Sequence, residues 1–313
     1  MTRWLKAALA IGLAVGLVWA IDYWLGWDRL FAPWLRLHPG SLALALAVAL
    51  GSHGLRAVRF QRFFIQTRGV GLQHALQLVL RHNLLNVLLP LRSGEVSFPV
   101  LARRGYGIEL GEAVGGLLVF RLFDLHTIAW LAAVALYAAT GVVAWLLIAA
   151  LLLPLPVLAW WLADRLYPLT RRLPARAAGL MASVYRGIPG HGGALGEVWG
   201  WTIAVWLGKL AAFAWLLTRF GDIDFGRAWL GATAGDITSV LPIHGWAGAG
   251  TYEAGVVAAL TPLGVDAAAA LAMAVNLHLF ILGTTLLGGM IAFLVPARRH
   301  ATTPAPGAET RER

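Results

Sequence analysis

The residues best suited to chemistry in this chain are charged side chains inside long hydrophobic stretches. The clearest group lies between residues 83 and 95, N-L-L-N-V-L-L-P-L-R-S-G-E, where an apolar run stops at Pro90 and Arg92, Gly94 and Glu95 follow. Proline ends a helix, and glycine permits backbone conformations that other residues avoid. The pattern predicts two short helices that meet at a charged tip. The arginine there could bind a phosphate or carboxylate through its planar fork.

A second break of the same kind follows later in the chain. The sequence P-I-H-G-W-A-G-A-G lies between two apolar segments, and the second segment begins T-Y-E. A glycine-rich turn lets the backbone approach a ligand, and the histidine and glutamate could exchange protons. Transporters place substrate sites at charged breaks in hydrophobic segments. We therefore predict a substrate-binding site from both breaks, made of Arg92, Gly94, Glu95, His244, Gly250 and Glu253.

A structural role is the alternative for each of these side chains. Arg92 would then tie its tip to a carboxylate such as Glu253, and His244 would hold a hydrogen bond. In all, four cations and four carboxylates fall inside predicted membrane segments: Arg81, Arg92, Arg121, Lys209, Glu95, Asp124, Asp236 and Glu253. Each would cost roughly 2.5–3.5 kcal/mol at the centre of a lipid-facing helix, so they must face protein or water.

Two intramembrane charge pairs are expected to be structural. Arg121 and Asp124 are three residues apart, which places them on one helical face. Lys209 and Asp236 are expected to pair across two helices. These four residues are therefore predicted to hold helices together, whereas the residues at the breaks are predicted to bind the substrate.

Composition excludes most other chemistry. The 313 residues include no cysteine, so disulfides, thiolate catalysis and cysteine metal sites are absent. The nine histidines form no H-E-x-x-H pair, and no G-x-S-x-G elbow or phosphate-binding glycine loop occurs. We expect no metal, no cofactor, no catalytic residue and hence no enzyme. The net charge of +10 would suggest nucleic acid in a soluble protein. Here the arginines cluster between apolar runs and indicate membrane topology instead.

The chain is predicted to be an all-α polytopic membrane protein. It is 59% hydrophobic and 13% charged, whereas soluble domains carry about 25% charge. The apolar runs are too long for barrel strands. The first run could be the core of a signal peptide, but an uncleaved helix is favoured because so many spans follow. We expect about six transmembrane helices, near residues 7–20, 41–60, 112–137, 142–163, 198–217 and 267–295.

The two breaks are predicted to lie in re-entrant helical hairpins, 72–104 and 226–263. Basic residues, which mark the cytoplasmic side, flank the first hairpin at both ends: Arg56, Arg59, Arg62 and Arg68, then Arg103 and Arg104. The second half repeats the first with directions reversed, an inverted-topology repeat with its substrate site near the bilayer midplane. We assign residues 1–140 and 141–296 to the two repeats and 297–313 to a disordered tail. Both termini are expected in the cytoplasm.

At the tip sequence L-P-L-R-S-G-E the chain resembles the lysylphosphatidylglycerol synthase transmembrane-region family, also called flippase-like membrane proteins. The first family signature is matched by Asn86, Leu89, Pro90, Arg92, Gly94, Glu95, Arg121 and Asp124. The second, a Pro-Gly-Gly-rich turn that ends in glutamate, is matched by Pro242, Gly248, Gly250 and Glu253. The resemblance covers about residues 40–295. Larger relatives carry a soluble aminoacyltransferase domain, which is not found in this sequence, so synthesis of lysyl-lipid is not expected.

The resemblance implies a lipid flippase or transporter of the bacterial inner (cytoplasmic) membrane. Its substrate would be an anionic or glycosylated lipid, whether phospholipid, polyprenyl-phosphate or glycolipid. Arg92 would bind the headgroup, while Glu95 and Glu253 with His244 would gate the path or couple it to protons. One alternative is a membrane transferase that acts on a lipid-linked substrate with Glu95 or Glu253 as general base. Another is a non-transporting scaffold of a lipid or hopanoid biosynthesis complex. A second copy of the chain or a biosynthetic protein is a further expected partner.

Overall fold

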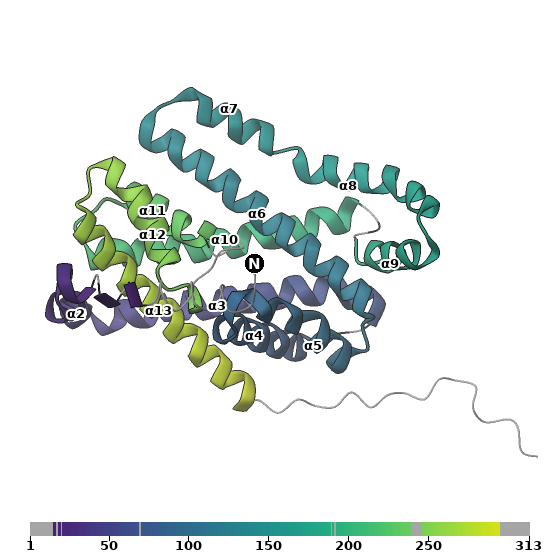
Figure 1. The fold of residues 1–313 in the computed structure, drawn as a ribbon, viewed down its shortest axis with the longest axis horizontal. Helices are drawn as coiled ribbons and strands as arrows, with labels where there is room; N and C mark the ends of the chain where they lie inside the picture. The colour runs from purple at the N-terminus through teal and green to yellow at the C-terminus, as the bar shows by residue number, and fades with distance from the viewer. Residues whose placement is uncertain are drawn as a thin grey trace, which may run out of the picture.

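The fold is helical throughout the part of the chain that a computed structural model describes (Figure 1). No strand occurs in that part, which confirms the all-α class. Nearly all of the first predicted span and the predicted tail, 297–313, lie outside it. The described residues are 15–16, 18–19, 21–68, 70–188, 190, 192–238 and 246–294.

Five segments are long and apolar enough to cross a membrane, and they match five of the six predicted crossings. A transmembrane helix needs about 20 apolar residues, and each of these segments exceeds that length. The segments are Pro39–Phe64 in α3 (Pro39–Arg68), α6 (Leu110–Thr140), Val143–Thr170 across α7 (Val143–Leu152), α8 (Leu155–Leu166) and η3 (Tyr167–Arg172), α10 (Gly192–Phe220) and α13 (Ala267–Leu294).

Shorter helices join these segments. The break between α7 and α8 falls at Pro154, which has no N–H with which to continue a helix. The predicted connection over residues 21–39 is itself helical, with a π-helical turn η1 (Ile21–Leu25) followed by α2 (Trp27–Arg36). Trp34 Nε1 in α2 donates to Asn276 Oδ1 in α13 at 2.6 Å. The arginine-rich connection after α8 contains α9 (Ala175–Tyr185), which lies against α6.

The first predicted hairpin folds as α4 (Leu72–Leu88), the 3-10 turn η2 (Pro90–Val96) and α5 (Ser97–Tyr106). Proline at the first position of η2 has no N–H to donate, so α4 ends there. A side chain at Gly94 would overlap the backbone of Leu85 and Asn86, which shows how closely η2 packs on α4. Ten residues of α5 span about 15 Å, half of the hydrocarbon thickness.

The second predicted hairpin folds as α11 (Phe225–Thr238), η4 (Trp246–Gly248), α12 (Thr251–Leu260) and η5 (Thr261–Leu263). The turn before α12 uses left-handed backbone at Ala247, Gly248 and Gly250, with φ of 52°, 90° and 81°. The two helices lie against each other, and Tyr252 of α12 packs directly on Gly235 of α11. Re-entry into the membrane and the inverted repeat stay predictions.

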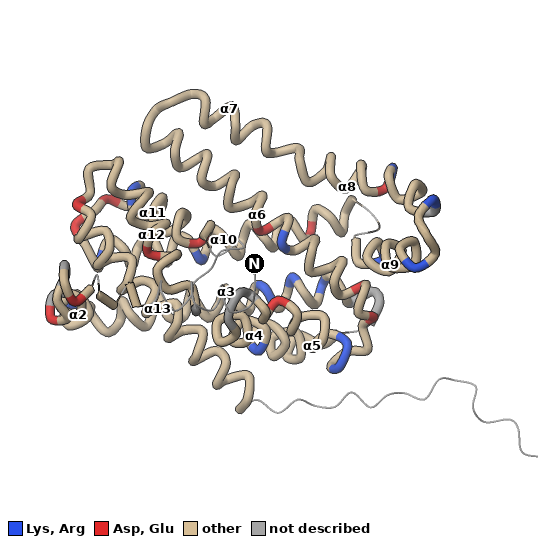
Figure 2. Tube along the Cα trace, in the orientation of Figure 1, with Lys and Arg blue, Asp and Glu red and all other residues tan. Residues whose placement is uncertain are grey.

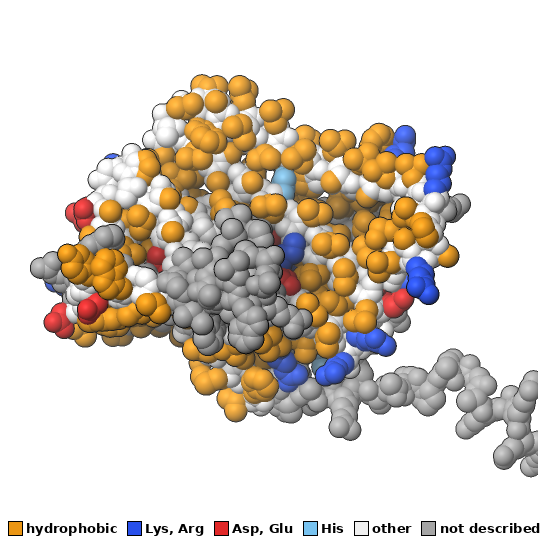
Figure 3. All heavy atoms as spheres, in the orientation of Figure 1, with side chains coloured by type: hydrophobic (Ala, Val, Ile, Leu, Met, Phe, Trp, Pro, Cys, Tyr) orange, Lys and Arg blue, Asp and Glu red, His pale blue; other side chains and the backbone are white. Residues whose placement is uncertain are grey.

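Two hydrophobic clusters hold the bundle together. One joins α3, α4, α5 and α6 around Phe60, Phe98 and Phe120. The other joins α10 to α13, with contributions from α3 and α6, around Leu217 and Leu277. The outer surface is also apolar, and hydrophobic side chains cover most of the visible face along α7, α8 and α13 (Figure 3). Charged side chains therefore lie either at the ends of the bundle or in the space between the two hydrophobic clusters.

Charge at the ends of the bundle is sorted by sign. Acidic residues gather near α2 and the α10–α11 connection, while basic residues gather near α5, α8 and α9 (Figure 2). From the positive-inside bias we expect the second end to face the cytoplasm. Single cysteines in this cysteine-free chain test that orientation.

We expect cysteines at Gln73, Arg104 and Arg176 to react only with thiol reagents that reach the cytoplasm. Cysteines at Asp28 and Asp224 should react with an impermeant reagent added outside intact cells. All five positions are exposed, so labelling reports their side of the membrane. Gln73 and Arg104 stand at the two ends of the first hairpin. If they labelled from opposite sides, that hairpin would cross the membrane and would not be re-entrant.

Candidate functional site

A polar cavity of about 190 Å3 lies between the two hydrophobic clusters. Its walls come from α3, α4, α5, α6, α10, α11, α12 and α13, and η4 supplies Ala247 and Gly248. The turn of the second hairpin contacts both α4 and η2 of the first, so the two predicted breaks do meet. The charged residues that line the cavity are Arg56, Arg59, Arg121, Lys209, Asp124 and Asp236.

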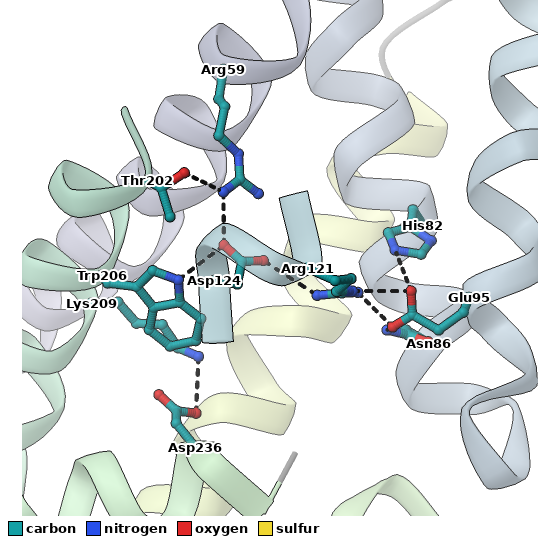
Figure 4. Close-up of polar contacts among 10 residues, drawn as sticks. All are labelled: Arg59, His82, Asn86, Glu95, Arg121, Asp124, Thr202, Trp206, Lys209 and Asp236. Atoms are coloured by element: carbon teal, nitrogen blue, oxygen red, sulfur yellow. Dashed lines mark hydrogen bonds and ion pairs between the residues drawn. The ribbon is translucent and has the colours of Figure 1, made fainter. Parts of the chain in front are cut away.

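Arg59 and Asp124 form the buried centre of the charge network (Figure 4). Arg59 Nη1 donates to Asp124 Oδ1 at 2.7 Å and to Thr202 Oγ1 at 2.9 Å, and Trp206 Nε1 donates to the same Asp124 oxygen at 3.0 Å. The two ionic side chains are only 5% and 3% exposed. The prediction that Arg59 marks the end of a span is wrong, because α3 continues to Arg68 and buries it.

Arg121 links this centre to the first hairpin. Its guanidinium holds Glu95 through two hydrogen bonds, Nη2 to Oε1 at 2.5 Å and Nε to Oε2 at 3.2 Å. The predicted contact with Asp124 is present but longer, at 3.5 Å. Asn86 Nδ2 also donates to Glu95, at 3.0 Å, and His82 Nε2 lies 3.9 Å from it. Glu95 is thus bound across the α4–η2 turn, and a chain of charges connects the hairpin to α3.

Lys209 and Asp236 form the predicted pair across helices. Lys209 Nζ on α10 donates to Asp236 Oδ1 on α11 at 2.9 Å. The ammonium also lies 4.7 Å from the centre of the Trp206 ring, a cation–π contact. The pair therefore fixes the second hairpin to α10 beside the cavity.

Glu253 binds α13 rather than the first hairpin. Its Oε1 lies 2.6 Å from His278 Nδ1, and its Oε2 accepts a hydrogen bond from Gly250 N at 2.7 Å. The other nitrogen of His278, Nε2, lies 3.0 Å from the carbonyl oxygen of Ala247. His278 thus bridges both ends of the turn before α12. Each of the two predicted hairpin carboxylates has partners of its own.

The remaining predicted residues are placed as follows. Gly94 and Gly250 lie at their turns, the first packed on α4 and the second capping α12. Only the backbone of Arg92 is described, within η2, and His244 lies outside the described residues. Arg81 Nη2 donates to Ala292 O at 3.2 Å, so this cation satisfies a carbonyl in the last turn of α13.

Sequence reasoning missed Arg56, Arg59 and His278 as members of the site. A signal for the first two was present, because His53, Arg56 and Arg59 recur every third residue and therefore share one face of a helix. They were assigned to a cytoplasmic cluster because more arginines follow. His278 gave no local signal, since its partner lies 25 residues earlier in the chain.

The described part of the chain contains no group of three or more side chains placed to hold a metal ion. Apart from Arg56, the charged residues that line the cavity take part in ion pairs. An arrangement of guanidinium, ammonium and carboxylate groups around a cavity of this size can bind a polar headgroup by replacing some of these pairs with its own contacts.

Comparison with known proteins assigns the family. The family model of the lysylphosphatidylglycerol synthase TM region matches residues 6–289. No curated protein matches the chain. The matched range includes both hairpins and every charged residue of the cavity. This chain is a multi-pass membrane protein that belongs to the lysylphosphatidylglycerol synthase transmembrane-region family, which is linked to lipid metabolism.

Proposed function

We propose that this protein is a flippase, which moves a lipid with an anionic or glycosylated headgroup across the bacterial inner membrane. The observation that carries the proposal is the charged cavity between the two hairpins. It is enclosed by helices long enough to cross a membrane, and one of its cations, Arg121, is bound by Glu95 in the turn of the first hairpin.

The cost of burying charge supports a transport role. Replacing a buried ion pair by apolar residues is often neutral or stabilising, so such pairs are not needed for stability alone. Here three pairs contribute side chains to the walls of one cavity: Arg59–Asp124, Lys209–Asp236, and Arg121 of the Arg121–Glu95 pair. A polar headgroup that enters this space exchanges water for protein contacts, while its acyl chains can stay in the hydrocarbon region.

We infer that the turns of the two hairpins move during transport. Both turns contact each other at the cavity, and both are joined to long helices by side-chain bonds that can open singly. Glu95 and Glu253 hold these bonds, so movement of either hairpin changes the contacts of a carboxylate. Proton coupling through Glu253 and His278 follows from the same arrangement.

The family name also fits a second candidate, a membrane transferase that acts on a lipid-linked substrate. In that case Glu95 or Glu253 would act as general base. Both carboxylates would first have to leave their present partners. We therefore place transport first and let one experiment separate the two.

The experiment fills the cavity without changing its charge. Val87 lines the cavity, and its neighbour Leu88 is 48% exposed on the other face of α4. Purified protein in vesicles should speed the movement of fluorescent phosphatidylglycerol between leaflets, measured by chemical quenching of the outer leaflet. We expect Val87→Trp to abolish most of this movement and Leu88→Trp to preserve it. Equal movement in protein-free vesicles would reject the flippase, and a chemically altered lipid by mass spectrometry would favour the transferase.

A further inference from the structure

Arg56 differs from the other cations that line the cavity. Arg59, Arg121 and Lys209 each hold a carboxylate, whereas Arg56 makes no ion pair or hydrogen bond within the part of the chain that the structure describes. Its Nε is buried without a hydrogen-bond partner. The contact that its guanidinium makes is with the ring of Trp206, 5.6 Å from the ring centre.

A second donor without a partner lies in the same cavity. Tyr252 is 4% exposed, and its hydroxyl has no hydrogen-bond partner among the described residues. Its ring packs on Gly235, the residue before Asp236. A buried hydroxyl left unpaired costs about 1–3 kcal/mol, so a group that accepts its hydrogen bond would stabilise the site.

Trp206 brings these groups to one place. Its ring contacts Arg56 on one helix and Lys209 on another, and Lys209 in turn binds Asp236 beside the Tyr252 ring. The result is a subsite built from α3, α10, α11 and α12 that offers a guanidinium, an ammonium and a phenol. All three are hydrogen-bond donors.

We propose that this subsite binds the phosphate group of the transported lipid. A phosphate has several acceptor oxygens and carries negative charge, and an arginine fork matches its geometry. A sugar headgroup carries no charge to offset the Arg56 guanidinium, which makes no ion pair within the described residues. Of the lipid classes open to this family resemblance, the subsite therefore selects those that carry phosphate. This inference rests on the proposed function and specifies its substrate class.

The test measures binding to the full-length protein in detergent by isothermal titration calorimetry. The probes are dioctanoyl phosphatidate, dioctanoylglycerol bearing one glucose, and inorganic phosphate. We expect phosphatidate to bind at least tenfold more tightly than the glycolipid. Arg56→Gln should weaken phosphatidate binding at least tenfold, Tyr252→Phe several-fold, and Arg56→Lys less than Arg56→Gln because the charge remains. Rising salt should weaken the wild type more than Arg56→Gln.

Arg219→Gln is the matched control. Arg219 also lies over a tryptophan, 5.3 Å from the centre of the Trp215 ring, but it is exposed at the end of α10 outside the cavity. It should bind phosphatidate as the wild type does. Gel filtration and a melting curve of each variant establish that it is folded. If Arg56→Gln does not fold, Arg56→Lys and Tyr252→Phe still test the subsite.

The outcomes separate this inference from the proposed function. Equal binding of the two lipids, or unchanged phosphatidate binding in folded Arg56 variants, would overturn the phosphate subsite. Inorganic phosphate bound as tightly as phosphatidate, with the same dependence on Arg56, would support the anion site but overturn the lipid as its source. Glycolipid moved across vesicles without phosphatidate would keep the flippase and reject the subsite. Phosphatidate that binds at Arg56 but does not move between leaflets would keep the subsite and reject the flippase.

Discussion

Asp124→Ala is expected to remove most of the folded protein. Asp124 accepts hydrogen bonds from Arg59 and Trp206 and lies 3.5 Å from Arg121. Its loss leaves the Arg59 guanidinium buried without a counter-charge, which costs roughly 3–5 kcal/mol. Folded domains are stable by only about 5–15 kcal/mol, so this single change takes a large share. The yield of monodisperse protein in fluorescence-detected gel filtration, with the melting temperature, measures the loss.

Glu109→Ala is the control for this prediction. Glu109 pairs with Arg186 at 2.6 Å, but both side chains are more than half exposed. Exposed pairs contribute about 0–1 kcal/mol, so yield should change little. The double variant Arg59→Met with Asp124→Leu should recover yield, because it removes both buried charges together. Similar yields for Asp124→Ala and Glu109→Ala would show that the Arg59 site is hydrated.

Much of the fold follows from the sequence because lipid imposes simple rules. A membrane span needs a long apolar run, and five of the predicted runs are helices of sufficient length. Proline marks the end of α4 and the break before α8, since it cannot donate the bond that a helix continues with. The helical form of residues 21–39 was missed. That segment is stabilised partly by Trp34 bound to Asn276, a contact between distant parts of the chain.

The candidate site was predicted only in part, for a related physical reason. Charged residues at membrane depth can be identified from composition, and Lys209 with Asp236 could even be paired. Which charged side chains pair with each other depends on how the helices pack. An arginine near the end of an apolar run can lie in the core or at the membrane surface. Arg59 was assigned to the surface on that ground and lies in the core. Glu95 was predicted as a substrate-binding residue, and its ion pair with Arg121 of α6 was not predicted.

Glu253→Leu is expected to loosen the turn before α12, whereas Glu253→Gln should keep it. His278 Nε2 faces the Ala247 carbonyl, so that nitrogen must carry a hydrogen. One further proton must then lie between His278 Nδ1 and Glu253 Oε1, which are 2.6 Å apart. A leucine of similar size can neither donate nor accept there, so it leaves the His278 ring nitrogen and Gly250 N without partners.

A glutamine at this position supplies the same hydrogen bonds. Its amide NH2 can donate to His278 Nδ1, while its carbonyl accepts from Gly250 N. The melting temperature and the rate of lipid movement of Glu253→Gln should then stay close to those of the wild type. Glu253→Leu should lower both, because each buried polar group that it leaves unpaired costs about 1–3 kcal/mol.

The size of the effect depends on the turn that His278 holds. Ala247 has a φ of 52°, a left-handed conformation that costs a residue with a side chain about 1–2 kcal/mol. His278 binds its carbonyl oxygen, and Ala247 and Gly248 both line the cavity. Loss of the Glu253 bond should therefore release this turn and change access to the cavity, so lipid movement should fall along with stability. Wild-type stability and wild-type lipid movement in Glu253→Leu would show that the Glu253–His278 bond has no part in gating.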